Sequence, residues 1–262
     1  MTIVLFVICF IASTLGSVVG FGGGVIIKPT VDMLGILSVS TASFLSGSTV
    51  LSMSVSSLIR SRNNGIRLET KTVTPLAIGA ALGGIAGKLI FDCIRTASGN
   101  ENLVGAVQSI LLLVTTVGVL IYTIKRDRLT SLHLENPISC SLAGLGLGLI
   151  SSFLGIGGGP INIAVLFFLF SMDVKTAAKN SIYIILFSQI TSLLFTLVTG
   201  TIPAFTPTAL IVMCIGGICG ALAGDKLTRL LSGGQTEVFL QLLVTVVILM
   251  NIYNSIRFLG AI

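Results

Sequence analysis

Eight apolar runs fill almost the whole chain, and they restrict its possible folds more than any other feature. They cover residues 2–35, 37–59, 72–91, 103–124, 137–170, 177–198, 206–224 and 238–259. Most are close to the ~20 residues that an α-helix needs to cross a bilayer. Only 9% of the residues are charged, whereas a soluble domain carries about 25%. The sequence therefore predicts an all-α integral membrane protein with no soluble domain of any size.

Two of these runs are interrupted by nearly the same sequence, "VVGFGGGVII" at 18–27 and "FLGIGGGPIN" at 153–162. Adjacent glycines disfavour a continuous helix, because glycine loses the most conformational freedom when it is ordered. Proline suits the first turn of a helix, so a new half-helix is expected to begin near Pro160. Each of the two runs is therefore predicted to fold as two helices with a break between them.

The glycine breaks belong to an internal repeat. The alignment that places Gly22–Gly24 on Gly157–Gly159, called the repeat alignment below, also places Ser46 on Ser181. A slightly longer shift, called the stripe alignment below, superimposes two glycine stripes, Gly79, Gly83 and Gly87 on Gly216, Gly220 and Gly224. The predicted organisation is a first repeat at 1–125, a charged linker at 126–135 and a second repeat at 136–262.

The distribution of basic residues indicates that the two repeats are inverted. The run 137–170 would form a helix of about 50 Å at ~1.5 Å per residue, so it either crosses once with a break or enters and returns. Returning places 11 basic residues on one side and 4 on the other, whereas crossing gives 7 and 8. The positive-inside rule favours the re-entrant arrangement. Each repeat is then a re-entrant broken-helix hairpin plus three transmembrane helices. The linker 125–136 is expected to be cytoplasmic and both termini extracytoplasmic, in the plasma membrane.

The broken segments predict a binding site at the centre of the membrane. Non-helical backbone at that depth is tolerated only where protein or a wet cavity satisfies its polar groups. Two helix starts facing each other near the midplane would direct unpaired N–H groups at an anion, an arrangement common in secondary transporters. The alternative is that the glycines only permit close packing, which is the interpretation favoured for the two glycine stripes.

The candidate substrate-binding residues combine the glycine breaks with nearby polar side chains. They are Gly22, Gly23, Gly24, Ser46, Thr49, Gly157, Gly158, Gly159, Asn162, Asn180, Ser181, Tyr183 and Gln189. For any single serine, a hydrogen bond to its own helix backbone is an equally good interpretation. Lys28 and Lys179 are the basic residues nearest the predicted site. Either could guide an anion, but the favoured expectation is that each extends to the membrane interface. The aspartates fall near segment ends, so no buried acid is expected.

Other functional classes find little support in the sequence. In a membrane chain the net charge of +6 reflects loop lysines and arginines that set topology, so nucleic acid is not expected as a partner. The five cysteines form no CxxC pair, and His133 is a lone histidine expected in a solvated loop. "GGIAGKLI" lacks the spacing and the hydroxyl residue of a phosphate-binding loop. No cofactor, metal site or enzymatic activity is expected.

The paired glycine signature "GSVVGFGGG" and "SSFLGIGGGP", each followed by Thr-Ala and a serine-bearing helix start, resembles the TauE/SafE family of membrane permeases. The family's A-x-G-T-S stretch corresponds to "ASFLS" at 42–46 and "AAKNS" at 177–181, where only the alanine and the final serine match. The resemblance covers essentially the whole chain. It implies a secondary transporter of small anions, with sulfite and organosulfonates such as sulfoacetate as the associated substrates, and it does not identify the substrate of this member.

The leading functional hypothesis is a permease that exports sulfite or an organosulfonate by alternating access around the two hairpin tips. Export suits the membrane potential, which favours an outgoing anion by about 2.3 kcal/mol per charge per 100 mV. An anion channel and a membrane scaffold without transport activity are the alternatives. The expected partners are the small anionic substrate and the lipid bilayer, and a homodimer is left open.

Overall fold

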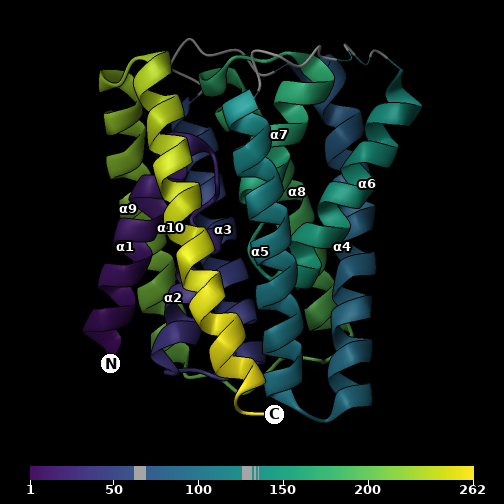
Figure 1. Cartoon of the computed structure of the whole chain (residues 1–262), viewed down its shortest axis with the longest axis vertical. Coiled ribbons are helices and arrows are strands. Elements are labelled where there is room, and N and C mark those ends of the chain that lie inside the picture. The colour runs from purple at the N-terminus through teal and green to yellow at the C-terminus, as the bar shows by residue number, and fades with distance from the viewer. Residues whose placement is uncertain (62–68, 126–131, 133, 135) are drawn as a thin grey trace.

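The described part of this computed structural model, residues 1–61, 69–125, 132, 134 and 136–262, contains ten α-helices and no strand (Figure 1). The helices are α1 (Thr2–Val19), α2 (Gly24–Leu34), α3 (Val39–Ser61), α4 (Thr70–Ser98), α5 (Glu101–Lys125), α6 (Pro137–Leu154), α7 (Gly159–Phe170), α8 (Val174–Val198), α9 (Pro207–Leu230) and α10 (Gly233–Leu259). The all-α prediction is confirmed. Most of the predicted linker, including His133, lies outside the described residues.

Among the described residues, eight helices are long and apolar enough to cross a membrane, namely all except α2 and α7. The exceptions have 11 and 12 residues, or about 17 and 18 Å at ~1.5 Å per residue. Neither can cross an apolar core of ~30 Å. Each of these two helices therefore ends inside the bundle and could cross the membrane only together with another helix.

Both predicted helix breaks are present. The first apolar run is split into α1 and α2 at residues 20–23, and the run 137–170 is split into α6 and α7 at residues 155–158. Helix α7 begins at Gly159 with Pro160 in its first turn, next to the predicted start. In Figure 1, the α1–α2 pair and the α6–α7 pair enter the bundle from opposite ends, and both chain termini lie at the end where α1 begins.

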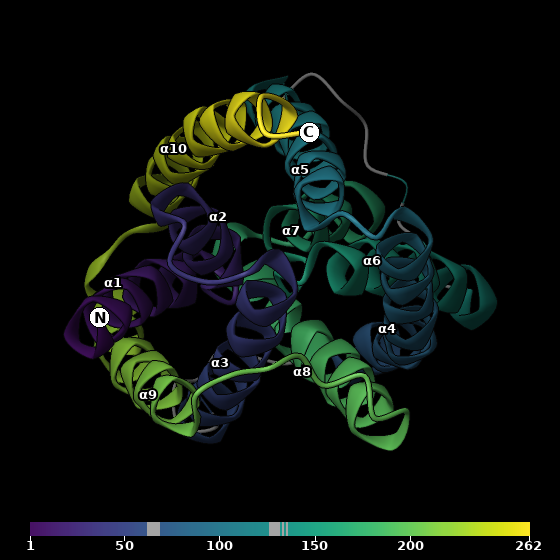
Figure 2. The same cartoon turned by 90° about the horizontal axis from the view of Figure 1, so that it is seen from below.

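Seen along the bundle, the long helices surround the two short ones (Figure 2). Helix α4 packs along α6, α1 along α9, and α5 along α10, while α3 contacts both α8 and α9. Helices α2 and α7 lie toward the middle, where α2 contacts α10 and α7 contacts α5. If α1 to α5 are exchanged in order with α6 to α10, the same set of helix pairs is obtained.

Two glycine stripes bring paired helices into backbone contact. They are Gly79, Gly83 and Gly87 on α4, and Gly216, Gly220 and Gly224 on α9. A Cβ at any of the α4 glycines would overlap a carbonyl oxygen of α6, and a Cβ at the α9 glycines would crowd the backbone of α1. The prediction that both stripes serve close helix packing is confirmed.

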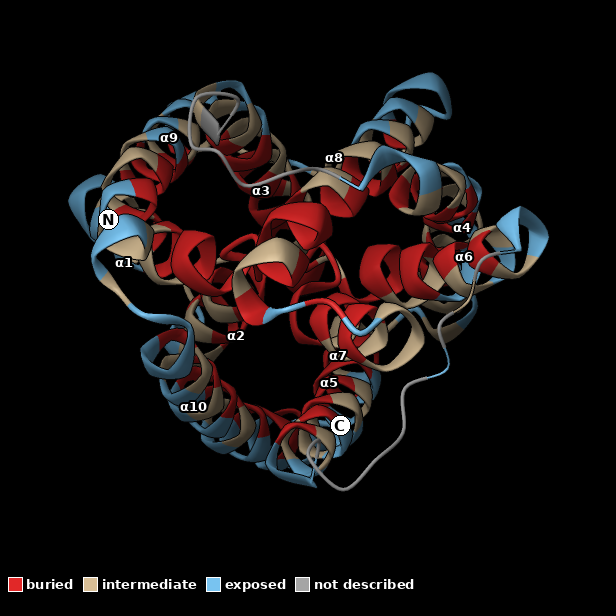
Figure 3. Cartoon of the chain, turned by 90° about the horizontal axis from the view of Figure 1, so that it is seen from above, coloured by how far each residue is buried: buried red, intermediate tan, exposed pale blue. Residues whose placement is uncertain are grey.

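Burial divides the bundle into a polar-containing centre and an apolar exterior. Buried residues gather in the middle and exposed ones on the outward faces (Figure 3). The outward faces carry large exposed apolar side chains such as Leu82 on α4, Ile211 on α9 and Leu249 on α10. A surface this apolar suits lipid rather than water. The protein is therefore a multi-pass membrane protein.

Candidate functional site

The two hairpin tips have matching backbone conformations. Three glycines in each tip have positive φ, and they occupy corresponding positions in the repeat alignment. The pairs are Gly20 and Gly155 (79° and 66°), Gly22 and Gly157 (74° and 82°), and Gly23 and Gly158 (72° and 88°). Only glycine adopts such angles readily, so the local sequence dictates both turns.

The tips contact each other inside the bundle. A Cβ on Gly24 would overlap the carbonyl oxygen of Ile156, and one on Gly159 would lie 3.0 Å from the carbonyl oxygen of Phe21 and 2.5 Å from Cγ2 of Val25. All five of these residues are fully buried or nearly so. The first turn of each short helix therefore packs directly against the opposite hairpin, as the central-site hypothesis requires.

The first backbone N–H groups of α2 and α7 are not used in the hydrogen bonding of the bundle. Helix geometry leaves the first N–H groups without an intrahelical acceptor. In the described part of the chain, the amides of Gly23, Gly24, Gly158 and Gly159 have no hydrogen-bond acceptor, and neither N-cap side chain can supply one, because both N-caps are glycine. Two helix N-termini with unpaired donors and positive dipole ends thus occur beside each other.

Helices α3 and α8 each pack against both tips. Gly22 and Gly157 both face the same two side chains, Val50 on α3 and Ile185 on α8, which correspond to each other in the repeat alignment. On α8, Ser181 Oγ donates to the carbonyl oxygen of Gly20 at 2.8 Å. Each of these two helices therefore contacts both tips.

Five buried polar atoms around the tips have no hydrogen-bond partner among the described residues. They are Oγ of Ser13, Ser43 and Ser151, Oδ1 of Asn162, and Nε2 of Gln189. Cβ atoms built on the tip glycines would lie 2.6 to 3.9 Å from these atoms. Unsatisfied buried polar groups are uncommon in native structures. This set, called the tip polar group below, can supply hydrogen bonds to a small polar ligand.

The structure places the predicted site residues in different surroundings. All six tri-glycine positions and Asn162, Ser181 and Gln189 lie at the tips. Ser46 is fully buried on α3 with an unpartnered hydroxyl.

Three predicted site residues lie away from the tips. Thr49 donates to its own helix at Leu45 and packs on Gly217 of α9. Asn180 contacts Met172, Thr176 and the backbone of Glu69, and the ring of Tyr183 packs at a tilt of 54° against that of Phe187, with centroids 5.0 Å apart.

A wide cavity of about 280 Å³ lies on one side of the tips, between α1, α3, α8 and α9. Its lining includes Ser17, Lys179 and Asp225. It is formed by the first turns of α8 and the last turns of α9, at the end of the bundle opposite the chain termini. Its described lining residues include three basic side chains, Lys175, Lys179 and Arg229, and one acidic side chain, Asp225.

A narrow cavity of about 30 Å³ lies on the other side, between α3, α4, α6 and α8. Most of the residues that line the wide cavity correspond, in the repeat alignment or the stripe alignment, to residues that line the narrow one. Examples are Ser17 with Ser152, Leu58 with Leu193, and Asp225 with Lys88. The two halves of the chain thus build comparable cavities of unequal size.

The expectation that Lys28 extends to the interface and that no acid is buried is wrong. Lys28 and Asp32 on α2 form an ion pair at 2.6 Å, and both side chains are 3% exposed. Asp225 is buried beside the first tip and accepts hydrogen bonds from Ser17 at 2.9 Å and Ser57 at 3.0 Å. Hydropathy placed these acids near segment ends, but Asp32 lies on the short helix of the first hairpin and Asp225 is enclosed by α1 and α3. Lys179 is buried as well, at 9% exposure.

Across the ranges 1–61, 69–125 and 136–262, no group of three or more His, Cys, Asp or Glu residues could hold a metal ion. The arrangement offers unpartnered polar side-chain atoms and two helix N-termini to a small polar solute.

The comparison with protein families gives a match over most of the chain. The model of the family described as sulfite exporter TauE/SafE matches residues 5–253. No curated protein and no solved structure matches the chain significantly. The matched region includes both hairpins, both cavities and nearly all ten described helices. The chain belongs to the TauE/SafE sulfite exporter family.

Proposed function

We propose that this protein is a secondary transporter that exports sulfite or a small organosulfonate across the plasma membrane. The main observation in support is the contact between the two broken-helix tips. The helix starts at these tips have unpaired N–H groups and lie beside the tip polar group. A helix start favours an anion through its free N–H groups and its dipole. The family membership supports transport as the activity.

The same proposal includes alternating access between two inverted repeats, 1–125 and 136–262. The unequal cavities support it, because corresponding residues of the two halves line one wide and one narrow space. Exchanging the conformations of the halves would close the wide cavity and open the narrow one. A channel fits less well, since about 30 Å³ on the narrow side has room for little more than a single water.

We further propose that the wide cavity faces the cytoplasm. The end that holds it also holds the basic residues near the start of α8 and the end of α9, and basic residues are enriched on the cytoplasmic side. The linker would then be cytoplasmic and both termini extracytoplasmic. The basic lining would gather anions from inside the cell, and the inside-negative potential would favour their exit.

Flux into and out of proteoliposomes tests the function. Purified protein is reconstituted, and uptake of labelled sulfite, sulfoacetate and other sulfonates is measured with chloride and phosphate as comparison anions. Saturable flux with counterflow of sulfite or a sulfonate is expected. Large unitary currents would indicate a channel instead. Absence of flux for every anion, in protein that remains monodisperse, would contradict the proposal.

A further inference from the structure

A partly buried lysine lines the narrow cavity and has no role in the site described above. Lys88 lies on α4 with its side chain 12% exposed, and it shares the cavity lining with Gly155 of the second tip and Gln189 of α8. Its ammonium is 3.1 Å from Asp92 Oδ1 and 4.6 Å from the ring centroid of Phe91. An ionisable residue at such a position in a membrane protein suggests a functional role.

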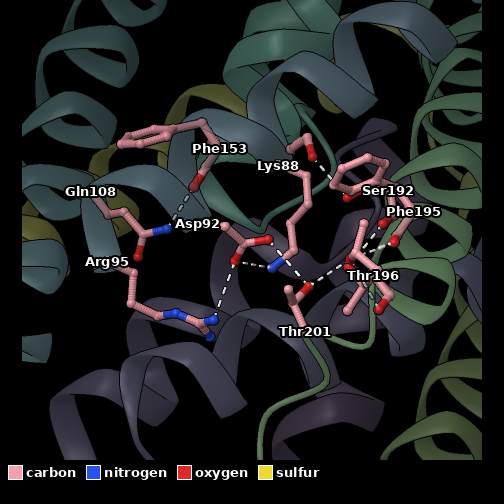
Figure 4. Close-up of polar contacts among 11 residues, drawn as sticks. Lys88, Asp92, Arg95, Gln108, Phe153, Ser192, Phe195, Thr196 and Thr201 are labelled. Atoms are coloured by element: carbon pink, nitrogen blue, oxygen red, sulfur yellow. Dashed lines mark hydrogen bonds and ion pairs between the residues drawn. The ribbon is translucent and has the colours of Figure 1, made fainter. Parts of the chain in front are cut away.

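Asp92, the ion-pair partner of Lys88, is also contacted by two other residues. Arg95 Nη2 lies 3.6 Å from Asp92 Oδ1, and Thr201 Oγ1 donates to Asp92 Oδ2 at 3.2 Å. Figure 4 shows Lys88, Arg95 and Thr201 converging on this one carboxylate. If the ammonium turned away, Asp92 would keep two donors. The cost of separating the pair is therefore lower than for an isolated buried ion pair.

The cavity beside Lys88 also contains unsatisfied polar groups. Gln189 is 2% exposed and its Nε2 has no partner, and this atom would lie 3.9 Å from a Cβ built on Gly157. The unpartnered hydroxyl of Ser43 lies next to Gly155 on the same cavity wall. A cation, an amide NH2 and a hydroxyl around one space suit a small oxyanion. No acidic residue is among the described residues that line this cavity.

Helix packing alone does not account for a positive charge here. In the stripe alignment Lys88 corresponds to Asp225, which lines the wide cavity. Both residues follow a glycine of the packing stripes, Gly87 and Gly224, which serve the same close contact. The two halves thus make comparable contacts with opposite charges at this position, so the sign of the charge is specific to the narrow cavity.

We propose that Lys88 binds the transported oxyanion in the narrow cavity and exchanges Asp92 for it. The ligand is a small oxyanion with one or two negative charges, held by the ammonium together with the Gln189 amide and the Ser43 hydroxyl. This inference rests on the proposed function, since the cavity must widen during the transport cycle to admit the anion.

The first test compares the KM for labelled sulfite in proteoliposomes containing wild type, Lys88→Gln or Lys88→Arg. Lys226→Gln is the charge-matched control, because Lys226 is exposed and lines neither cavity. Loss of a charge-assisted hydrogen bond should raise KM by about tenfold or more in Lys88→Gln. Lys88→Arg should retain most of the affinity, and Lys226→Gln should match wild type. An unchanged KM in Lys88→Gln would overturn this inference and leave the transport function standing, whereas a wild type that carries no anion would overturn both.

The second test separates charge from folding. Lys88→Cys is prepared in a background without Cys93, Cys214 and Cys219, the free cysteines that are not buried. The same folded protein is then alkylated with 2-bromoethylamine or 2-bromoethanesulfonate during turnover with a saturating sulfonate, when the narrow cavity is open. Complete modification is verified by mass, and the thioether adducts are stable to sulfite. The cationic adduct should restore sulfite transport and the anionic adduct should not. Equal effects of the two reagents, whether both restore transport or neither does, would contradict a role for the positive charge.

Discussion

At the residue scale, the positions that matter most in this molecule are those with no room for a side chain. Gly24 and Gly159 are the first residues of α2 and α7, and each faces the opposite hairpin without space for a Cβ. Because the two contacts are reciprocal, a change in one tip must move the other. The tips therefore behave as one packing unit rather than as two separate turns.

A methyl group added at the tip contact should destabilise the protein. For Gly24→Ala we expect a loss of about 1–3 kcal/mol, the usual range for forcing an extra methyl into a packed core. Gly146→Ala is the matched control, since Gly146 is also helical and nothing lies within 4 Å of its Cβ position. Thermal unfolding in detergent measures both variants. A Gly24→Ala protein as stable as Gly146→Ala would show that the tips do not pack tightly.

The buried pair on α2 gives a second expectation at this scale. Asp32→Ala should cost about 3–5 kcal/mol, because it leaves the Lys28 ammonium buried without its partner. The double variant Lys28→Met with Asp32→Leu should be much less destabilised, since no charge is then left unpaired. Thermal unfolding of the two proteins distinguishes these effects. Equal losses of stability in the two variants would mean that these side chains stabilise the protein through the geometry of α2 and not through pairing of their charges.

Individual site residues were only partly predictable from the sequence. Comparing the two repeats singled out Ser46 because its partner is Ser181, and Ser181 contacts a tip through the carbonyl oxygen of Gly20. Asn180 is the neighbour of Ser181 in the chain, yet it points toward Met172 and Thr176. Adjacent residues on a helix face directions about 100° apart, and only the positions of neighbouring helices decide which direction leads to the site.

At the element scale, helix boundaries follow local signals where those signals are strong. The breaks after α1 and α6 were predictable because glycine runs stop helices wherever they occur. The start of α8 has a different signal: Asp173 is its N-cap, and Oδ1 accepts from the backbone N–H groups of Lys175 at 3.0 Å and Thr176 at 3.1 Å. This cap holds the helix that supports both tips.

Removing the α8 cap should produce a small loss of stability that depends on pH. Burial raises the pKa of the Asp173 carboxyl, but the hydrogen bonds from Thr176 and Lys175 outweigh it and hold the pKa below its usual range. The stabilisation is therefore present above the unfolded-state pKa of ~3.9 and is lost as the pH falls through the folded-state pKa. Asp173→Ala should cost about 1 kcal/mol near neutral pH, and less where the wild-type carboxyl is protonated. Thermal unfolding as a function of pH measures the difference, and a difference that grows on acidification would contradict the assignment.

At the scale of the whole molecule, hydropathy and the repeat were sufficient for the class and for the number of long helices. They could not reveal that Asp32 and Asp225 are buried or that the wide and the narrow cavity form, because both features depend on helices distant in the chain. Asp225, for example, is enclosed by Ser17 of α1 and Ser57 of α3. Burial of an acid in this fold is a property of packing across the repeat, and a hydropathy plot describes each helix alone.

The unequal cavities lead to an expectation for the molecule as a whole. Leu58 lines the wide cavity and Leu193 the narrow one, and the two residues correspond in the repeat alignment and have similar partial burial. In the background without Cys93, Cys214 and Cys219, Leu58→Cys should react severalfold faster than Leu193→Cys with a water-soluble thiol reagent. The reason is that a cavity of about 280 Å³ admits the reagent and one of about 30 Å³ does not. Because both sites are leucines on a helix that supports the tips, intrinsic thiol reactivity should be similar, and the ratio of rates reports cavity access.

A transported anion that drives the exchange of conformations should bring the two rates closer together. Equal rates without the anion would indicate that the bundle is not biased toward one side, and a ratio that no substrate changes would argue against alternating access.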